Sequence, residues 1–437
     1  MFLWSAQQYE EADLVLPDGA RIHYVRVSDG TGWTDAIFEH VETATTSATP
    51  TAFYKSVMSW NGNGWDLRLK DGTVYVFGEN APLQAIRDRY GNTIEIAHQN
   101  GQLGAVTRVT SPHGRWFEFT YNGPLISELK DPAGRRWQYT YDGQSRLWKV
   151  TDPMDHVTEY TYDADHNMTS VKNRNGVVYV TNEYTTVADA PTPVGWVKKQ
   201  THADGGVYEF TYDVVDGKSV QTDVKDPLGY IRRVTFNDDG YVLEDRRAVG
   251  EPEERATVSG RQAGTHFVTA STLGGLTTAT TYDEFGNVTS VTRPLGTESV
   301  TTTYTYEPHF HQVATITDPL DHTTTFGYDV HGNLTSITDP LQHQTTFGYN
   351  SRGQRTSVTN ALQHTTTFVY QGGDLKSVTD PLSRTTTRVT DAAGRLLAVT
   401  DPLGHTTRYN YDANSQLRTV TDAPGARRRS TTGPEGS

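Results

Sequence analysis

The sequence contains no cysteine among its 437 residues. This absence excludes disulfide bonds and every metal site that is built on thiolates. Apolar residues are also scarce, since only 35% of the chain is hydrophobic and the mean hydropathy is −0.60. No stretch approaches the roughly 18 consecutive apolar residues that a membrane-spanning helix needs. We therefore expect no membrane insertion and no thick aliphatic core.

Basic residues are outnumbered, with 38 Lys and Arg against 52 Asp and Glu, and the net charge is −14. An acidic chain is repelled by phosphate backbones and anionic lipid, so nucleic acid is not expected as a partner. The first residues, Met1 to Gln8, carry no basic group and run into Glu10 and Glu11. This pattern predicts no recognisable signal peptide.

The most regular feature of the sequence is a repeat with a period of about 21 residues. The marker Asp-Pro-Leu, or a close relative of it, begins at Asp318, Asp339, Asn360, Asp380, Asp401 and Asp422. A second marker, Tyr followed by Asp or a substitute, runs in phase with it at Tyr328, Tyr349, Tyr370 and Tyr411. A fixed period of this length indicates an array of supersecondary units that must stack to bury apolar surface.

One repeat, residues 323–343, predicts two strands and two turns. Threonine, aromatic and β-branched runs alternate in it with Asp, Gly, Asn and Pro clusters, which are strand and turn signals. Phe326 and Tyr328 share a strand face, but Leu334 and Ile337 are three residues apart and cannot do so in a regular strand. Either the second strand carries a bulge or both faces are partly apolar. Low hydrophobicity favours a thin wall over a two-sheet sandwich.

These residues resemble the YD repeats of the RHS family, whose consensus is close to Tyr-Asp-x-x-Gly-x-Leu-x-x-Val-Thr-Asp-Pro-x-Gly. The segment Tyr282-Asp-Glu-Phe-Gly-Asn-Val-Thr-Ser-Val-Thr-Arg-Pro-Leu-Gly296 matches it nearly throughout. The residues that define the repeats are Tyr121, Tyr141, Tyr162, Tyr212, Tyr282, Tyr328, Tyr349, Tyr370 and Tyr411, with Asp131, Asp152, Asp226, Asp318, Asp339, Asp380 and Asp401.

The resemblance implies an all-β fold, in which an antiparallel ribbon of hairpins curls into a partial hollow shell with little or no helix. In the RHS family such shells enclose a toxic C-terminal domain. Many of these proteins also carry a self-cleaving aspartyl site around Asp-Pro-x-Gly-Leu. Here Asp226-Pro-Leu-Gly is followed by Tyr230 and Asp401-Pro-Leu-Gly by His405. We therefore expect neither the self-cleavage site nor a toxin domain on this chain.

Composition and motif density divide the chain into five expected regions. Residues 1–64 predict a β-rich cap, residues 65–176 YD repeats, residues 177–275 irregular repeats with loop insertions, and residues 276–425 regular repeats. Residues 426–437 lose the pattern and predict a disordered basic tail. Five of the eight tryptophans lie in the first 120 residues, which indicates an aromatic core or a ligand platform.

Three sets of residues are candidates for chemistry. The histidines 322, 343, 364 and 405, with His156, recur at one position of the repeat, which places equivalent residues two strands apart, about 9–10 Å. That separation is too large for neighbouring histidines to share a zinc ion. His309 and His311 are expected on one strand face, without a third ligand. Asp238, Asp239, Glu251, Glu253 and Glu254 are expected in solvated turns.

The sequence therefore predicts a non-enzymatic RHS-repeat structural protein with no catalytic, cofactor or metal site. The expected partner is another polypeptide, either a toxin domain or a remaining shell segment, in bacterial toxin delivery or competition. The expected location is secreted or associated with the bacterial cell surface. The alternative is a surface adhesin or carbohydrate-binding β protein that binds a glycan through its Trp-rich N-terminal region.

Overall fold

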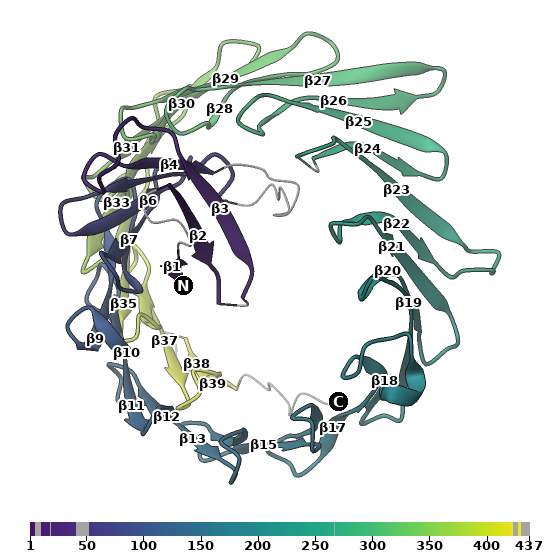
Figure 1. The fold of residues 1–437 in the computed structure, drawn as a ribbon. Coiled ribbons are helices and arrows are strands. Elements are labelled where there is room, and N and C mark those ends of the chain that lie inside the picture. Colours follow the sequence, from purple (N-terminus) through teal and green to yellow (C-terminus); the bar gives the residue numbers. More distant parts are fainter. Residues whose placement is uncertain (5–9, 18, 41–51, 266, 423–426, 430–437) are drawn as a thin grey trace.

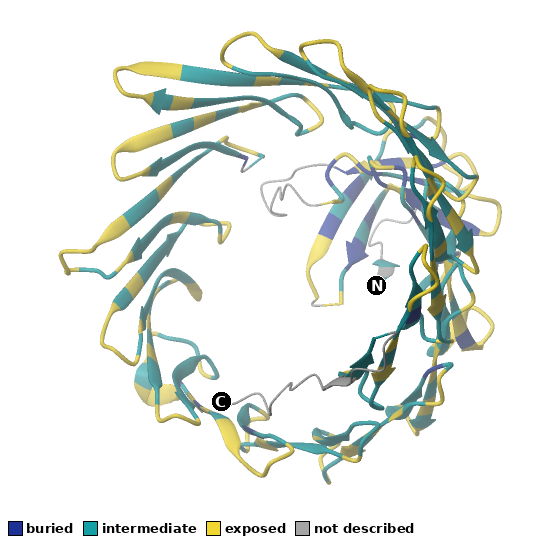
Figure 2. Ribbon diagram, turned by 180° about the vertical axis from the view of Figure 1, so that it is seen from behind, coloured by how far each residue is buried: buried dark blue, intermediate teal, exposed yellow. Residues whose placement is uncertain are grey.

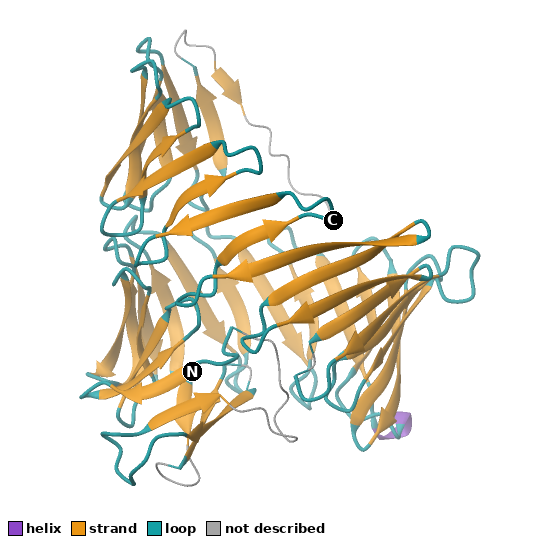
Figure 3. Ribbon diagram, turned by 90° about the horizontal axis from the view of Figure 1, so that it is seen from above, coloured by secondary structure: helices purple, strands orange, loops and turns teal. Residues whose placement is uncertain are grey.

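The structure is a computed structural model that describes residues 1–4, 10–17, 19–40, 52–265, 267–422 and 427–429. It contains 39 strands, and each strand pairs antiparallel with the next one along the chain. The one helical segment in this part of the chain is the 3₁₀ turn Val187–Asp189, drawn in purple in Figure 3. The all-β prediction is therefore confirmed.

The first ten strands are β1 (Phe2–Trp4), β2 (Glu11–Val15), β3 (Arg21–Arg26), β4 (Ile37–His40), β5 (Val57–Trp60), β6 (Gly64–Arg68), β7 (Val74–Gly78), β8 (Leu83–Arg87), β9 (Thr93–Asn100) and β10 (Leu103–Thr110). The next twelve are β11 (Trp116–Asn122), β12 (Leu125–Lys130), β13 (Arg136–Tyr141), β14 (Leu147–Thr151), β15 (Val157–Tyr162), β16 (Met168–Lys172), β17 (Val178–Tyr184), β18 (Val197–His202), β19 (Val207–Val215), β20 (Lys218–Lys225), β21 (Ile231–Phe236) and β22 (Val242–Arg247).

The remaining strands are β23 (Arg255–Arg261), β24 (Val268–Leu273), β25 (Leu276–Tyr282), β26 (Val288–Leu295), β27 (Glu298–Tyr306), β28 (Val313–Thr317), β29 (Thr323–Tyr328), β30 (Leu334–Thr338), β31 (Gln344–Tyr349), β32 (Arg355–Thr359), β33 (Thr365–Gln371), β34 (Asp374–Thr379), β35 (Thr385–Thr390), β36 (Leu396–Thr400), β37 (Thr406–Tyr411), β38 (Leu417–Thr421) and β39 (Arg427–Arg429). In β39, part of the tail that we expected to be disordered extends the sheet, because its backbone pairs with the open edge of β38.

A bulge recurs in the second strand of the repeats and explains how two apolar residues that are three positions apart can share one face of the sheet. Gly327 pairs with Ser336, but Tyr328 pairs with Leu334, so Thr335 is the extra residue. The bulge puts Leu334 and Ile337 on the face that carries Phe326 and Tyr328. The same shift precedes the turn after β13, β15, β25, β31, β33, β35 and β37. One face of the ribbon is thus aromatic and aliphatic, whereas the other carries mainly Thr, Ser and Gly.

The ribbon winds around an axis for more than one full turn (Figure 1). Strands β31–β38, in yellow-green, return to the same side as β6–β13, in blue, while β1–β3 and the N-terminus lie inside the winding. We call β5–β22 the first winding and β23–β38 the second winding. The predicted partial shell is therefore confirmed as an open sheet, coiled on itself.

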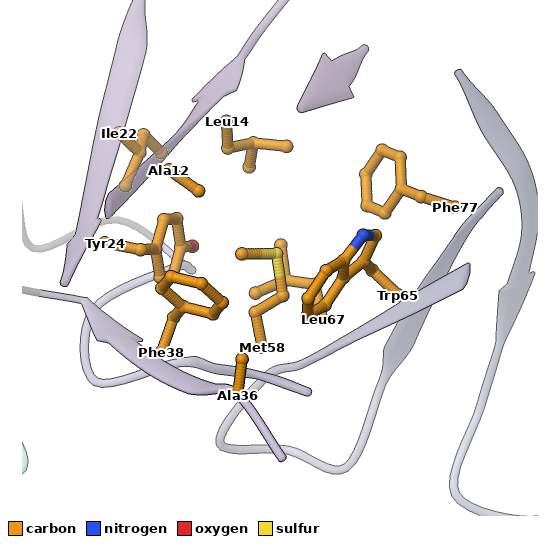
Figure 4. Close-up of a cluster of buried hydrophobic side chains, with 10 residues drawn as sticks. All are labelled: Ala12, Leu14, Ile22, Tyr24, Ala36, Phe38, Met58, Trp65, Leu67 and Phe77. Atoms are coloured by element: carbon orange, nitrogen blue, oxygen red, sulfur yellow. The ribbon is translucent and has the colours of Figure 1, made fainter. Parts of the chain in front are cut away.

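Almost all fully buried side chains lie near the N-terminus (Figure 2). The core cluster gathers residues from β2 to β7 and its loops, namely Ala12, Leu14, Ile22, Tyr24, Ala36, Phe38, Met58, Trp65, Leu67 and Phe77 (Figure 4). The buried Tyr24 hydroxyl and the Ser56 hydroxyl lie 2.8 Å apart and hydrogen-bond. This cluster extends past residue 64, the end that we expected for the cap. Elsewhere the wall is one sheet thick, and most of its side chains remain half-exposed.

Candidate functional site

The Asp-Pro turns are built around one carboxylate each. The Oδ1 atom of Asp318 accepts hydrogen bonds from the backbone N–H groups of Leu320 and His322, at 2.8 and 2.9 Å. Its Oδ2 atom lies 3.1 Å from Nδ1 of His322. The same Oδ1 geometry recurs at the other predicted aspartates, Asp131, Asp152, Asp226, Asp339, Asp380 and Asp401. These aspartates stabilise the turns because each short carboxylate accepts hydrogen bonds from backbone N–H groups that the strands do not pair.

The predicted tyrosines connect one hairpin to the preceding one. The Tyr328 hydroxyl donates to the carbonyl oxygen of Val313, 15 residues earlier, at 2.7 Å. Tyr121, Tyr141, Tyr162, Tyr212 and Tyr282 make the equivalent bond. Tyr349, Tyr370 and Tyr411 occupy the same register position beside the bulge. Tyr184 and Tyr306, which the sequence analysis did not single out, also donate to an earlier strand.

The repeat residues do not converge on one point, because they form two rows. In a meander, alternate turns lie on the same edge of the ribbon. The Asp-Pro turns follow even-numbered strands, and we call this side the even edge. The Tyr-Asp turns follow odd-numbered strands and form the odd edge. Each predicted residue therefore sits at a strand end or a turn, with its copies along the same edge.

The even edge of the first winding packs against the odd edge of the second winding, and we call this contact the seam. Arg89 donates to the carbonyl oxygen of Gly332 at 2.9 Å, and the Asn92 amide donates to that of Arg352 at 3.0 Å. The partners of these bonds are 243 and 260 residues apart in the sequence. Nearer the ends of the seam, Lys70 bonds Phe285 and Arg135 bonds Ser415. The seam therefore joins turns one full winding apart.

An ion pair between Arg115 and Asp374 crosses the seam. The Arg115 guanidinium also donates to the carbonyl oxygen of Ala392 at 3.2 Å, and the Thr390 hydroxyl donates to Asp374 at 2.6 Å. The hydrogen bond from Arg115 holds the pKa of Asp374 below its ordinary value. Both side chains are less than one-third exposed, so water screens the pair only in part.

Aromatic contacts reinforce the seam next to the N-terminal core. The rings of Tyr54 and Phe267 meet edge to face at 5.1 Å, and the Arg89 guanidinium lies 5.2 Å from the Phe310 ring centroid. Burial lowers the pKa of Lys70, against an opposing effect of Asp283. Sequence reasoning missed all of these residues. Their only signal was a long side chain at a turn, where solvent exposure is the usual expectation.

The histidine series belongs to the turns of the even edge. Nδ1 of His156, His322, His343 and His405 lies 2.9–3.1 Å from the carboxylate that begins its own turn. Arg384 replaces histidine in the same position and pairs with Asp380. Within the described residues, no group of three or more His, Asp or Glu side chains is arranged to hold a metal ion.

The expected placement of His309 and His311 on one strand face is wrong. Both lie in the connection between β27 and β28, because the Glu307 carboxylate accepts hydrogen bonds from the backbone N–H groups of His309, Phe310 and Gln312. His311 has a positive φ of 53° and its ring lies 4.3 Å from that of Phe285. His309 and His311 therefore lie near the seam and do not form a pair of metal ligands on one strand face.

The acidic candidates lie on opposite edges of the ribbon. Asp238 and Asp239 are in the turn between β21 and β22, on the odd edge, while Glu251, Glu253 and Glu254 are in the loop between β22 and β23, on the even edge. Glu254 accepts hydrogen bonds from the Arg246 side chain and the Gly250 N–H, each at 2.8 Å. The two groups therefore do not face each other across a common site.

The N-terminal tryptophans contact one another instead of forming parallel stacking faces. The Trp60 ring meets Trp33 at 4.3 Å and Trp65 at 5.3 Å, both edge to face. Trp65 is only 9% exposed and belongs to the core cluster, whereas Trp33 is 37% exposed. This arrangement is typical of the border of an aromatic core. Trp33, Trp60 and Trp65 therefore do not form the groove of exposed rings that the glycan-binding alternative requires.

The turn aspartates predict a loss of stability in acid. Backbone hydrogen bonds from His322 and His343 lower the pKa of Asp318 and Asp339, and the Arg384 side chain lowers that of Asp380. A carboxylate with a lowered folded-state pKa stabilises the fold above its ordinary pKa of about 4, and this contribution disappears as the pH falls through the lowered value. We expect the thermal midpoint, followed by circular dichroism, to be steady at neutral pH and to fall steeply below about pH 4.

The control for the acid experiment is Asp339→Asn, which removes one titrating carboxylate but keeps an acceptor oxygen in the turn. Its midpoint should change less between neutral and acidic pH than that of the unmodified chain. A midpoint that stays constant down to about pH 2 would contradict the role of these carboxylates.

The structure thus defines a class of repeat protein, in which hairpins form a continuous antiparallel ribbon that coils and closes on itself along a seam. The RHS Repeat family model matches residues 119–153, 146–178, 282–321, 308–344, 328–365 and 391–436. The chain therefore contains RHS repeats over these residues. No curated protein sequence matches it.

Two solved structures share the fold. The TcdB2-TccC3-Cdc42 structure is 13% identical with a TM-score of 0.52, and the match covers 94% of this chain and 26% of that one. The Tc holotoxin pore of Photorhabdus luminescens is 12% identical with a TM-score of 0.51, covering 96% and 26%. The chain therefore spans about a quarter of the length of these structures. No described segment forms a helix with the length and hydrophobicity to cross a membrane.

Proposed function

We propose that this chain is a wall segment of a shell that surrounds another polypeptide, and that it does so without catalysing a reaction. The observation that carries the proposal is the seam, because it turns a flexible ribbon into a wall that is continuous from one winding to the next. A wall that is one sheet thick and wetted on most of its surface suits enclosure better than it suits a buried active site.

The likeness to Tc toxin structures supports a place in bacterial toxin delivery or competition, with secretion or cell-surface association. The partner would be a toxin domain or a further shell segment. Four of the candidate histidines, His156, His322, His343 and His405, and the Glu254 carboxylate are paired within turns or loops, which supports a structural role for them. We do not propose the glycan-binding alternative, since Trp65 is buried and Trp60 packs between two other indoles.

Enclosure can be tested with a protease-sensitive, unfolded segment fused after Ser437. If the wound ribbon surrounds such a segment, trypsin should cut it markedly more slowly than the same segment fused to an unrelated carrier. The matched control is the same fusion carrying Arg115→Asp, which opposes Asp374 with a second negative charge and weakens the seam. Equal cleavage rates in all three fusions would refute enclosure.

A further inference from the structure

The even edge of the second winding carries a row of exposed leucines. Leu320, Leu341, Leu362, Leu382 and Leu403 occupy the third position of successive Asp-Pro turns, and they are 74%, 76%, 74%, 71% and 81% exposed. Their N–H groups all donate to the first residue of the turn, so the five side chains have equivalent positions. Large apolar side chains that recur in one exposed row are unusual on a protein surface.

The same turn position makes contacts in the part of the first winding that forms the seam. Tyr90 and Met154 make the equivalent N–H bond to the residue that begins their turns, and His113 is third in Ser111-Pro112-His113. All three are half-buried. Tyr90 lies on Gly353 and His113 lies on Gly373 so closely that a methyl group on either glycine would overlap the ring. At these two places in the seam, therefore, the third turn residue packs against a glycine of the facing odd edge.

The complementary glycines are open on the odd edge of the first winding. Gly101, Gly123, Gly217 and Gly240 lie in turns after odd-numbered strands and have positive φ angles of 73°, 60°, 76° and 83°. No heavy atom of the described residues lies within 4 Å of the position that a Cβ would take on any of them. In the second winding, Gly332, Gly353, Gly373 and Gly394 of the odd edge are covered by side chains, whereas Gly264 and Gly372 are open.

The two free edges also match in spacing. Successive turns on one edge are two strands apart, about 9–10 Å, whichever edge is considered. The five leucines therefore span about 40 Å. The open glycine turns form two pairs of neighbours, Gly101 with Gly123 and Gly217 with Gly240, separated by the turns after β13, β15 and β17. One chain thus presents a row of exposed apolar side chains on one edge and two pairs of uncovered glycine turns on the opposite edge.

We propose that the leucine row is a docking edge for a second copy of this chain, which would bind through the open glycine turns of its first winding. The contact repeats the geometry of the seam, with leucine in place of Tyr90 and His113. Because the two surfaces differ, the association is head to tail and extends into longer oligomers instead of closing as a symmetric dimer. This inference goes beyond the proposed enclosure and does not depend on it.

Sedimentation velocity over a wide range of protein concentration tests the proposal. The unmodified chain should form oligomers that grow with concentration. The triple variant Leu341→Glu, Leu362→Glu, Leu382→Glu should weaken association at least tenfold, and so should Gly240→Asn together with Gly123→Asn, since asparagine tolerates positive φ but fills the open position. Val369→Glu is the matched control, because Val369 is 54% exposed but lies within β33.

A crosslinking experiment locates the contact independently of any loss of folding. A photoreactive phenylalanine at Leu362, followed by mass spectrometry, should join this turn to peptides that contain Gly101, Gly123, Gly217 or Gly240 of another copy. A chain that is monomeric at every concentration would overturn the proposal. Crosslinks confined to sheet faces, or equal dissociation by Val369→Glu, would overturn it as well.

Discussion

Truncating Leu67 to alanine should destabilise the N-terminal core by about 2–5 kcal/mol, the range for a fully buried leucine that leaves a cavity. Leu67 is 0% exposed and is surrounded by the apolar side chains of the core cluster. No other part of the described chain gathers so many fully buried side chains. The free energy of unfolding of this region should therefore depend on single core residues.

The measurement is native-state hydrogen exchange of the amides in β2 to β7, which reports the stability of this region separately from that of the wall. Leu334→Ala is the matched control, since Leu334 is only half-buried in the single-sheet wall and its truncation should cost clearly less. Equal losses of protection in the two variants would contradict a concentrated core.

Reversing the charge of Arg115 should open the seam while leaving the hairpins on both sides folded. Arg115→Asp removes the bonds to Asp374 and Ala392 and places two carboxylates opposite each other. We expect the amides of the turns around Arg115 and Asp374 to exchange at least tenfold faster, which corresponds to about 1.4 kcal/mol. Small-angle X-ray scattering should also show a larger radius of gyration.

A charge-swap variant distinguishes the loss of the Arg115–Asp374 ion pair from a general loss of stability. In the double variant Arg115→Asp, Asp374→Arg, the ion pair is restored with reversed polarity, so part of the lost protection should return. Arg136→Ala is the control, because Arg136 pairs with Glu128 inside one winding and not across the seam. If the swap recovers nothing, or if Arg136→Ala opens the seam equally, the ion pair does not hold the windings together.

The repeat and its turns could be predicted from sequence because their causes are local. An aspartate at the start of a turn captures donors two and four residues later, so the geometry is complete within five residues. The bulge at Thr335 was one of two explanations for the spacing of Leu334 and Ile337, and the other was a sheet with apolar residues on both faces. Residue spacing alone does not distinguish them. His309 and His311 were misplaced because the Glu307 carboxylate was not recognised as the organiser of a turn.

The seam could not be predicted, because its partners are 215 to 280 residues apart. Which turns meet depends on the circumference of one winding, and this circumference is set by the twist and the bulges of many strand pairs. A short sequence motif does not determine it. The N-terminal core was anticipated as an aromatic cap, but residues 65–77 contribute Trp65, Leu67 and Phe77 to it and lie beyond its expected end.

The seam also limits how the length of this protein can change during evolution. A turn of the first winding meets two successive turns of the second, as the turn that holds Arg89 and Asn92 does, so an insertion or deletion of a whole repeat moves every downstream contact by one complete step. The facing residues change, but a turn of the even edge still meets turns of the odd edge. Loss of a single hairpin strand would instead bring the wrong edge to the seam. Gene duplication and recombination in whole-repeat units are therefore the changes in length that this architecture tolerates.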